Sequence, residues 1–268
     1  MSQMLYIVAT PIGNLEDITF RALETLKKVD FIAAEDTRVT LKLLTKFQIK
    51  KPLMSYYAHN LKESGEAILK KLLDGQSCAL VTDAGTPVIS DPGVLLLKLC
   101  RENNIPITPI PGASAVICAL SASELCSGRF CFEGFLSVNK SSRSAHLESL
   151  KNEQRTIVFY EAPHKLLKTL KDIYSAFGER GLTVARELTK LHEEILTTTL
   201  SNAIEIYENK SPKGEFVLII DGSKKEDKII TPEIIESDNF KDIIASLREQ
   251  GLSRNEAYKL TLQHRRPQ

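Results

Sequence analysis

The stretch Ser77–Asn103, SCALVTDAGTPVISDPGVLLLKLCREN, contains three kinds of sequence in succession. Its apolar start, SCALVTD, is typical of a buried strand, and GVLLLKLCREN has the apolar spacing of a helix. Between them, Gly, Pro, Asp, Thr and Ser crowd into one loop. Glycine allows the backbone to approach a ligand closely, and proline stiffens it. The stretch predicts a strand–loop–helix unit whose loop either binds a ligand or is an elaborate turn, with Ser90 or Asp91 capping the helix.

The same alternation extends along the first part of the chain. Strand-like runs occupy residues 5–9, 31–36, 52–57, 77–83 and 106–110, and a helical pattern follows each of them. This alternation is typical of an α/β domain with a buried parallel sheet. Right-handed crossovers place TPIGN, AEDTR, DAGTPVISDPG and PGASA at the carboxyl ends of the strands, which is the edge where such sheets usually bind ligands.

The second part of the chain has a different organisation. Small residues around positions 121–127 suggest a domain boundary, and two consecutive strands near Thr183–Leu200 suggest a mixed sheet. A charged stretch after Asp221 indicates a linker. We therefore predict an N-terminal α/β domain over residues 1–120, a second α/β domain over 121–222, and a linker with a short helical tail over 223–268.

Composition excludes several classes of protein. The 268 residues have a formal net charge of only +1, so any contact with RNA requires a local basic patch. No apolar run approaches the roughly 20 residues of a membrane span. The histidines lack metal-ligand spacing, so we expect no metal. The cysteines lack a CxxC pair and no signal peptide is visible, which indicates reduced thiols in the cytoplasm; they are Cys78, Cys100, Cys118, Cys126 and Cys131.

Two charged segments have both a structural and a functional interpretation. AEDTR places Glu35, Asp36 and Arg38 at a strand-to-helix junction, where a helix cap with a local ion pair is the usual outcome. The basic segment 140–155 either contacts a phosphate backbone or forms a solvated helix face. Tyr56, Tyr57 and His59 of YYAHN belong to residue types that stack on bases or bind phosphate, although a surface histidine is the simpler interpretation.

Seven motifs, in this order, resemble the tetrapyrrole methylase superfamily, and specifically its branch that methylates ribosomal RNA. They are VATPIGNLEDITFRALETL, AEDTR, VTDAGTPVISDPG, PIPGASA, FYEAPHK, ARELTK and GEFVLIIDG, and they span roughly Leu5 to Gly222. The branch that methylates tetrapyrroles has a glycine-rich loop where this chain has TPIGN, and it lacks EDTR. The resemblance implies two α/β domains of a class III methyltransferase with S-adenosylmethionine in the cleft between them, followed here by a short helical tail.

The resemblance also implies which residues bind the cofactor. Pro11 comes from the first loop, and Leu188 closes the pocket. Ser114 and Ala115 lie near the ribose, and Tyr160 and Glu161 meet the adenine through backbone groups. The methionine end is lined by Thr82, Asp83, Gly85 and Thr86.

The reaction implied is methyl transfer to the ribose 2′-hydroxyl of a cytidine in the decoding region of 16S rRNA, within the small ribosomal subunit, by a homodimer. We expect Glu35, Asp36 and Arg38 to act on the substrate side. The alternative is that the motif orders the cleft while proximity supplies most of the catalysis. Asp83, Asp91 and His59 are the other candidates for a general base. Two rival functions remain: a methylase of a corrin-like macrocycle or other small molecule, and a binding module without catalysis.

Overall fold

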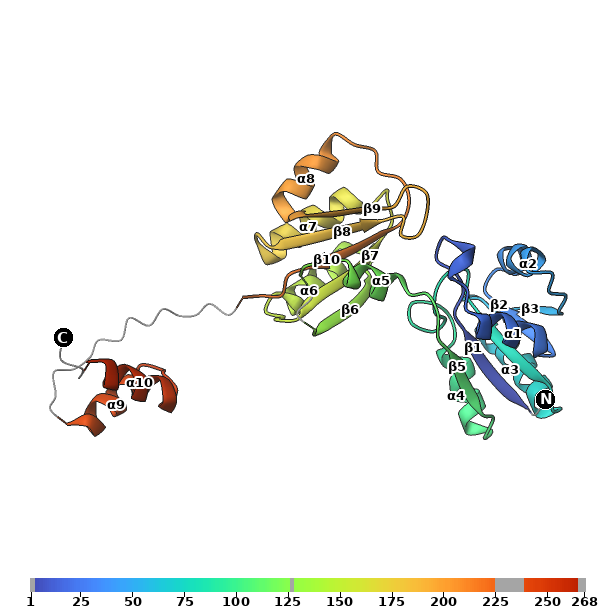
Figure 1. Cartoon of the computed structure of the whole chain (residues 1–268), viewed down its shortest axis with the longest axis horizontal. Helices are drawn as coiled ribbons and strands as arrows, with labels where there is room; N and C mark the ends of the chain where they lie inside the picture. Colours follow the sequence, from blue (N-terminus) through green and yellow to red (C-terminus); the bar gives the residue numbers. More distant parts are fainter. Residues whose placement is uncertain (1–2, 126–127, 225–238, 265–268) are drawn as a thin grey trace. The chain divides into compact units, whose positions relative to one another are not determined.

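The computed structural model describes residues 3–125, 128–224 and 239–264. Its contacts group the chain into two units, Met1–Ser223 and Lys224–Gln268. The first unit contains two five-stranded sheets with their helices, and the second contains a pair of helices, α9 (Phe240–Glu249) and α10 (Arg254–His264) (Figure 1). A division of the first unit at residue 120 stays a prediction.

The first sheet is parallel throughout and has the strand order β3-β2-β4-β1-β5. Every residue of β2 and β4 is buried, because helices cover both faces of the sheet. The α/β prediction is confirmed. The strands are β1 (Met4–Val8), β2 (Phe31–Ala34), β3 (Leu53–Ser55), β4 (Ser77–Val81) and β5 (Ile107–Ile110). The helical segments are η1 (Leu15–Asp17), α1 (Phe20–Lys28), α2 (Thr37–Lys46), α3 (Leu61–Leu73), α4 (Val94–Glu102) and α5 (Ala115–Ser121).

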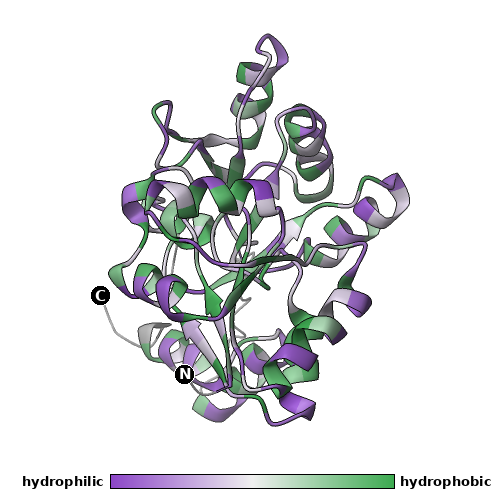
Figure 2. Ribbon diagram, turned by 90° about the vertical axis from the view of Figure 1, so that its right-hand side faces the viewer, coloured by the Kyte–Doolittle hydropathy of each residue, from purple (hydrophilic) through white to green (hydrophobic). Residues whose placement is uncertain are grey.

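Successive residues of these strands belong to different apolar clusters. Leu80 packs with Leu5 and Leu96, whereas its neighbour Val81 packs with Val8 and Leu26. Neighbouring side chains of a strand point to opposite faces of a sheet, so the two clusters are the two faces of the first sheet. The strands are accordingly coloured hydrophobic in Figure 2, while hydrophilic residues are concentrated on the helices and loops.

The second sheet has the strand order β6-β7-β10-β8-β9. It contains both parallel and antiparallel pairs, as expected for the predicted mixed sheet. Its β6–β7 pair is parallel, and the other three pairs are antiparallel. The strands are β6 (Phe130–Phe135), β7 (Thr156–Glu161), β8 (Gly181–Arg186), β9 (Glu194–Thr199) and β10 (Phe216–Ile220). The helices are α6 (Lys140–Leu150), α7 (Leu166–Phe177) and α8 (Leu200–Glu208).

A shared apolar cluster joins the two sheets within the first unit. Ile12 and the α5 residues Val116 and Leu120 pack with Ala185 and Val217 of the second sheet. The backbone N–H of Asn14 also donates a hydrogen bond to Thr189 Oγ1 at 3.0 Å. The loop after β1 and helix α5 therefore fix the edges of the two sheets against each other.

Three observations on the described residues bear on the expectations drawn from composition. Cys78, Cys100, Cys118 and Cys131 are free thiols, and Cys126 lies outside the described residues. In the ranges that the structure describes, no helix combines the length and the hydropathy required to traverse a lipid bilayer. Those ranges also contain no group of three or more His, Cys, Asp or Glu side chains placed to hold a metal ion.

Gly112 offers a test of the packing at the carboxyl edge of the first sheet. A Cβ at this position would lie 2.8 Å from the Cβ of buried Ala9, which has no flexible side chain to move aside. We predict that Gly112→Ala lowers the free energy of unfolding by about 1–3 kcal/mol, measured by urea denaturation. Gly65→Ala is the control, because its Cβ meets the movable Leu99 Cδ1 at 3.2 Å. An unchanged stability in Gly112→Ala would contradict this account.

Candidate active site

The loops after β1 and β4 are tied together by their backbones. Thr10 N–H donates to the Gly85 carbonyl at 2.9 Å, and Gly85 N–H donates back to the Thr10 carbonyl at 3.1 Å. The Thr10 hydroxyl adds a hydrogen bond of 3.1 Å to the Thr82 carbonyl. Gly85 has φ +85°, a conformation that glycine adopts without strain. The loop after β4 is therefore held by the loop after β1 rather than being a simple turn. The expected cap by Ser90 or Asp91 is wrong, because the N-cap of α4 is Gly93 and no side chain caps this helix.

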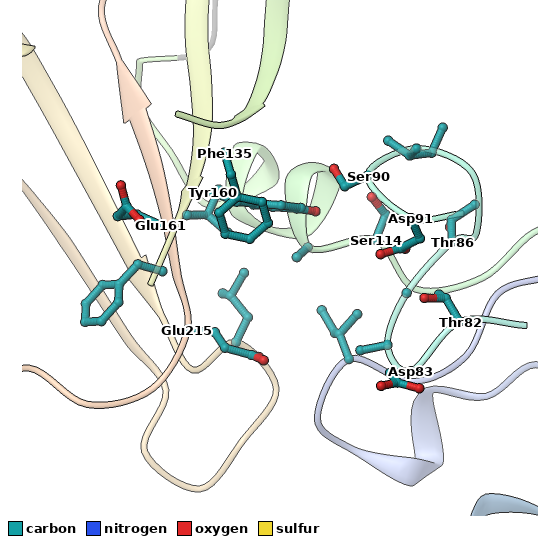
Figure 3. Close-up of a pocket in the computed structure, with 18 of the residues that line it drawn as sticks. Thr82, Asp83, Thr86, Ser90, Asp91, Ser114, Phe135, Tyr160, Glu161 and Glu215 are labelled. Carbon is teal, nitrogen blue, oxygen red and sulfur yellow. The ribbon is translucent and has the colours of Figure 1, made fainter. Parts of the chain in front are cut away.

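A cavity of about 430 Å³ opens beside these loops, within the range of small-molecule sites. Figure 3 shows Phe135 and Tyr160 of the second sheet on one side, and Ser90, Asp91 and Thr86 of the loop after β4 on the other. Both sheets thus contribute to its walls. The lining residues are Ile12, Glu35, Thr82, Asp83, Ala84, Gly85, Thr86, Ile89, Ser90, Asp91, Ser114, Ala115, Phe135, Tyr160, Glu161, Ala162, Pro163, Ala185, Leu188, Glu215, Phe216 and Val217.

The charge of this cavity has one sign. Five of the described residues that line it are carboxylic acids, and the described lining includes no Lys, Arg or His. The acids are Glu35, Asp83, Asp91, Glu161 and Glu215. A partly enclosed site lined by one sign of charge concentrates ligands of the opposite sign. The cavity is therefore suited to a cationic ligand with a substantial apolar or aromatic part.

Two of the carboxyl groups hold their protons more strongly than an ordinary aspartate. Burial raises the pKa of Asp91, and the nearby charges of Glu35 and Asp83 raise it further, although a hydrogen bond from Thr82 opposes them. Burial also raises the pKa of Asp83. The charge of Asp91 acts on Tyr160 as well, raising the pKa of that phenol in addition to the effect of burial. Asp91 thus interacts electrostatically with groups on both sides of the cavity.

The three residues of AEDTR have different surroundings. Glu35 lines the cavity, and its carboxylate accepts a hydrogen bond of 2.5 Å from the Thr82 hydroxyl. Asp36 lies outside the lining; it caps α2 by accepting from Arg38 N–H at 2.8 Å and pairs with the Arg38 guanidinium at 2.6 Å. The hydrogen bonds from Arg38 lower the pKa of Asp36 to about 2. The cap and ion pair expected on structural grounds are thus present.

Asp36 nevertheless adjoins the cavity, because its backbone N–H donates to Asp83 Oδ1 at 3.1 Å. Nine of the ten residues expected to bind the cofactor line the cavity: Thr82, Asp83, Gly85, Thr86, Ser114, Ala115, Tyr160, Glu161 and Leu188. The tenth, Pro11, is not among the lining residues, whereas its neighbour Ile12 is. The roles assigned to all ten, and to Glu35, Asp36 and Arg38, stay predictions.

The side chain of Glu161 has a structural role. It accepts hydrogen bonds from Ala162 N–H at 2.7 Å and from the buried Thr169 hydroxyl at 2.5 Å, so it fixes the start of the β7–α7 connection. These bonds occupy the carboxylate. The backbone of this segment is left to line the cavity, in keeping with the expectation that Tyr160 and Glu161 act through backbone groups.

Several lining residues were missed by the sequence reasoning. Phe135 ends β6, is 57% exposed, and lies against Tyr160 with ring centroids 5.5 Å apart. Glu215 precedes β10 and accepts a hydrogen bond from Lys190 at 2.8 Å. A signal was available for Glu215 in the motif GEFVLIIDG, but its position at the cavity depends on β10 lying between β7 and β8. That strand order is not visible in sequence periodicity.

The basic segment 140–155 is largely neutralised in the structure. Arg143 is buried, and its Nε donates to Asp172 at 2.7 Å. Lys151 pairs with Glu148 at 3.3 Å, and Arg155 pairs with Glu153 at 2.7 Å. These contacts favour a structural role for the segment over contact with a phosphate backbone.

Comparison with known proteins identifies the family. A family model described as Tetrapyrrole (Corrin/Porphyrin) Methylases matches residues 4–204. The chain belongs to this family. It is 53% identical to the ribosomal RNA small subunit methyltransferase I of Synechocystis over 255 residues, covering 95% of this chain and 90% of the relative. It is 44% identical to the protein of the same name from Bacillus subtilis over 256 residues, covering 96% and 88%.

Several solved structures share the fold of this chain. Diphthine synthase matches with a TM-score of 0.63 at 13% identity, covering 96% of this chain and 99% of that chain. The uroporphyrin-III C-methyltransferase from Thermus thermophilus, complexed with S-adenosylhomocysteine, matches with a TM-score of 0.57 at 16% identity, covering 80% and 96%. As a tetrapyrrole methylase, the chain is a methyltransferase that uses S-adenosylmethionine. The cavity fits that cofactor, because Glu35, Asp83 and Asp91 line it and none of its described lining residues is a cation, which suits the positively charged sulfur.

The charge of the cavity predicts a preference between the cofactor and its demethylated product. S-adenosylhomocysteine lacks the methyl group and the positive charge on sulfur. Protonation removes the Asp83 and Asp91 charges at a higher pH than usual, because their pKa values are raised. We therefore predict that the preference for S-adenosylmethionine over S-adenosylhomocysteine, measured by calorimetry as the ratio of the two affinities, weakens as the pH is lowered from neutral, and does so at a higher pH than the titration of an ordinary aspartate. Asp91→Asn should lower the ratio severalfold at neutral pH; a ratio independent of pH and of this substitution would contradict the electrostatic account.

Proposed function

We propose that this protein transfers the methyl group of S-adenosylmethionine to the ribose 2′-hydroxyl of a cytidine in the decoding region of 16S rRNA. The observation that carries the proposal is the identity of 44–53% to relatives named ribosomal RNA small subunit methyltransferase I, along nearly the whole chain. The anionic cavity between the two sheets supports the cofactor part of the proposal.

In this proposal, the loop after β4 holds the methionine end of the cofactor. Thr82, Asp83, Gly85 and Thr86 supply backbone and hydroxyl groups there, while Thr86 is itself oriented by donating to the Ala113 carbonyl at 3.1 Å. Ser114 and Ala115 begin α5 and lie beside the ribose. The backbone of Tyr160 and Glu161 meets the adenine, Leu188 closes the cavity, and Pro11 acts by shaping the loop that carries Ile12.

The positively charged sulfur of the cofactor makes its methyl group susceptible to displacement. The task of the chain is to align the 2′-oxygen, the methyl carbon and the sulfur. Pre-positioning of this kind contributes up to about 7–11 kcal/mol in well-oriented reactions. A ribose hydroxyl is a weak nucleophile at neutral pH, so a carboxylate that accepts its proton adds to the rate.

In this proposal, the residues that act on the RNA substrate are Glu35, Asp36 and Arg38. Glu35 faces the cavity, and Asp36 fixes Arg38, whose side chain is 87% exposed at the rim. Asp91 is the alternative base, because it lies in the cavity, its pKa is raised, and it faces groups from both sheets. Glu35, Asp36 and Asp91 lie in loops at the carboxyl edge of the first sheet, and Arg38 lies in the first turn of α2.

Asp36→Asn separates a role in turnover from a role in folding. Asparagine caps helices about as well as aspartate, so α2 keeps its start while Arg38 loses its charged partner. We predict that methyl transfer falls by about 10²-fold while the affinity for S-adenosylmethionine and the melting temperature stay near wild type. Single-turnover kinetics and calorimetry measure the two quantities. Unchanged turnover would remove Asp36 from the proposed catalytic group.

The cellular setting belongs to the same proposal. A decoding-region nucleotide is structured in the assembled small subunit, so we take that particle as the substrate and the cytoplasm as the location. We also propose a homodimer. Exposed apolar side chains such as Leu15, Phe20, Ile117 and Leu191 are compatible with a second copy of the chain covering part of the surface.

The decisive test uses methyl-labelled S-adenosylmethionine with small subunits that lack the native modification. We predict label on the 2′-oxygen of a decoding-region cytidine, mapped by nuclease digestion. Subunits that already carry the modification are the control and should accept no label. Absence of label despite measurable cofactor binding would overturn the proposed substrate and favour a methylase that acts on a corrin-like macrocycle. Label on a corrin-like substrate would establish that alternative.

A further inference from the structure

The basic residues of the chain are unevenly distributed. Between Thr37 and Lys62 there are six Lys and Arg residues and no Asp or Glu, whereas the rest of the chain has 29 Lys and Arg against 34 Asp and Glu. This segment comprises α2, β3 and the start of α3, at one edge of the first sheet (Figure 1). A protein with almost no net charge therefore carries one strongly basic segment.

Three of these six cations lie on one side of α2. Thr40, Leu43 and Leu44 form the buried side of α2. Arg38, Lys42 and Lys46 follow at intervals of four residues, so they form a stripe on the opposite, exposed side, with a rise of about 6 Å between neighbours. Lys50 is exposed in the connection to β3. We call Arg38, Lys42, Lys46 and Lys50 the basic face.

The lysines of the basic face lack acidic partners within the described part of the chain. Lys42, Lys46 and Lys50 form none of the ion pairs found among those residues, which distinguishes them from the paired cations of segment 140–155. Arg38 is paired with Asp36, but its side chain remains 87% exposed. Unpaired, solvated cations in a row suit a polyanion, because its phosphates replace water and small counterions.

The basic face begins at the rim of the cavity. Asp36, which caps α2, donates its backbone N–H to Asp83 at 3.1 Å, and Asp83 lines the cavity. The charge of Asp83 also raises the pKa of Arg38, after the larger effects of Asp36. A chain of phosphates along α2 would therefore lead to the point where the proposed reaction occurs.

Aromatic groups lie at the same end of the basic face. Ser55 pairs with Ala34, and Tyr56 N–H donates to the Ala34 carbonyl at 2.8 Å, so Tyr57 and Asp36 follow paired strands at the same edge of the sheet. Tyr57 is exposed and has an edge-on contact with His59, with ring centroids 6.3 Å apart. Exposed aromatic rings next to cations are typical of surfaces that bind single-stranded or unstacked nucleotides.

We propose that the basic face docks the phosphate backbone of the ribosomal RNA that flanks the target nucleotide, with Tyr57 and His59 contacting an adjacent base or sugar. This inference rests on the proposed function for the identity of the RNA. Charge determines which part of the RNA binds at each site. The phosphates bind to the lysines outside the cavity, and the carboxylates inside it admit the ribose and repel the phosphates.

The test compares two variants with equal loss of charge. Lys42→Gln/Lys46→Gln/Lys50→Gln removes the three unpaired cations of the basic face. Lys140→Gln/Lys168→Gln/Lys210→Gln removes three exposed lysines at the start of α6, on α7 and after α8, none of which forms an ion pair among the described residues, and is the matched control. Cofactor affinity of both variants should equal that of wild type, because none of these lysines lines the cavity. The melting temperature should also stay near wild type, because all six side chains are exposed and form no ion pair among the described residues.

For the basic-face variant we predict a KM for unmodified small subunits at least tenfold higher, with kcat within about twofold of wild type. The slope of log affinity against log salt should fall by about 2, since each phosphate contact to a single strand contributes about 0.7. The control variant should retain both values. A basic-face variant with the wild-type KM and salt slope would overturn the proposal.

Two further readouts separate this proposal from the proposed function. Sedimentation binding to subunits requires no methyl transfer, so lysine-dependent binding without label would retain the basic face while removing the proposed reaction. Ultraviolet crosslinking identifies the occupant. A peptide from residues 37–62 attached to ribosomal RNA supports the proposal, and the same peptide attached to a ribosomal protein overturns it.

Discussion

The antiparallel bridge between Thr10 and Gly85 is the constraint on which the site depends. In a parallel sheet, the regular hydrogen bonds join the strands, so the loops that follow neighbouring strands need contacts of their own to be fixed against each other. Here the two backbone bonds of the bridge, with the bond from the Thr10 hydroxyl to the Thr82 carbonyl, hold the loop after β4 against the loop after β1. Ile12 lies two residues beyond the bridge and packs with Ala185 and Val217. The same short loop therefore orders the floor of the cavity and its opposite wall.

Charge is separated over a short distance at this edge of the molecule. The cavity contains carboxylates without a lining cation among the described residues, while α2, which starts at its rim, carries only basic charges. The Asp36–Arg38 pair marks the border between the two. A cavity that held phosphate-binding cations would attract the polyanion into the space required by a cationic cofactor. Because the negative charges lie in the cavity and the positive charges lie on α2, the cofactor and the RNA can bind together. A ribose hydroxyl rather than a phosphate then lies where the cavity meets α2.

The first sheet could be predicted from sequence because each of its strands is short, apolar on both faces and followed by a helix. This pattern also predicted that Thr82, Asp83, Gly85 and Thr86 would share an edge with Ser114. The second sheet was harder, because β10 comes last in the chain but lies between β7 and β8. The lining positions of Glu215 and Phe135 depend on that order. Arg143 shows a different difficulty: its type and neighbours suggest a surface cation, but a distant partner, Asp172 on α7, allows it to be buried.

The joint between the two sheets explains why the cavity requires both of them. Its floor comes from the loops after β1, β4 and β5, but Phe135, Tyr160 and Glu215 come from the second sheet. The contact between Gly13 and the Leu188–Lys190 segment is so close that a Cβ at Gly13 would lie 2.5–2.8 Å from its atoms. A glycine at this position keeps the TPIGN loop against the wall formed by Leu188. Because the loop also carries Thr10, any change that pushes the two sheets apart here alters the Thr10–Gly85 bridge, so cofactor binding and the alignment of the two sheets are physically linked.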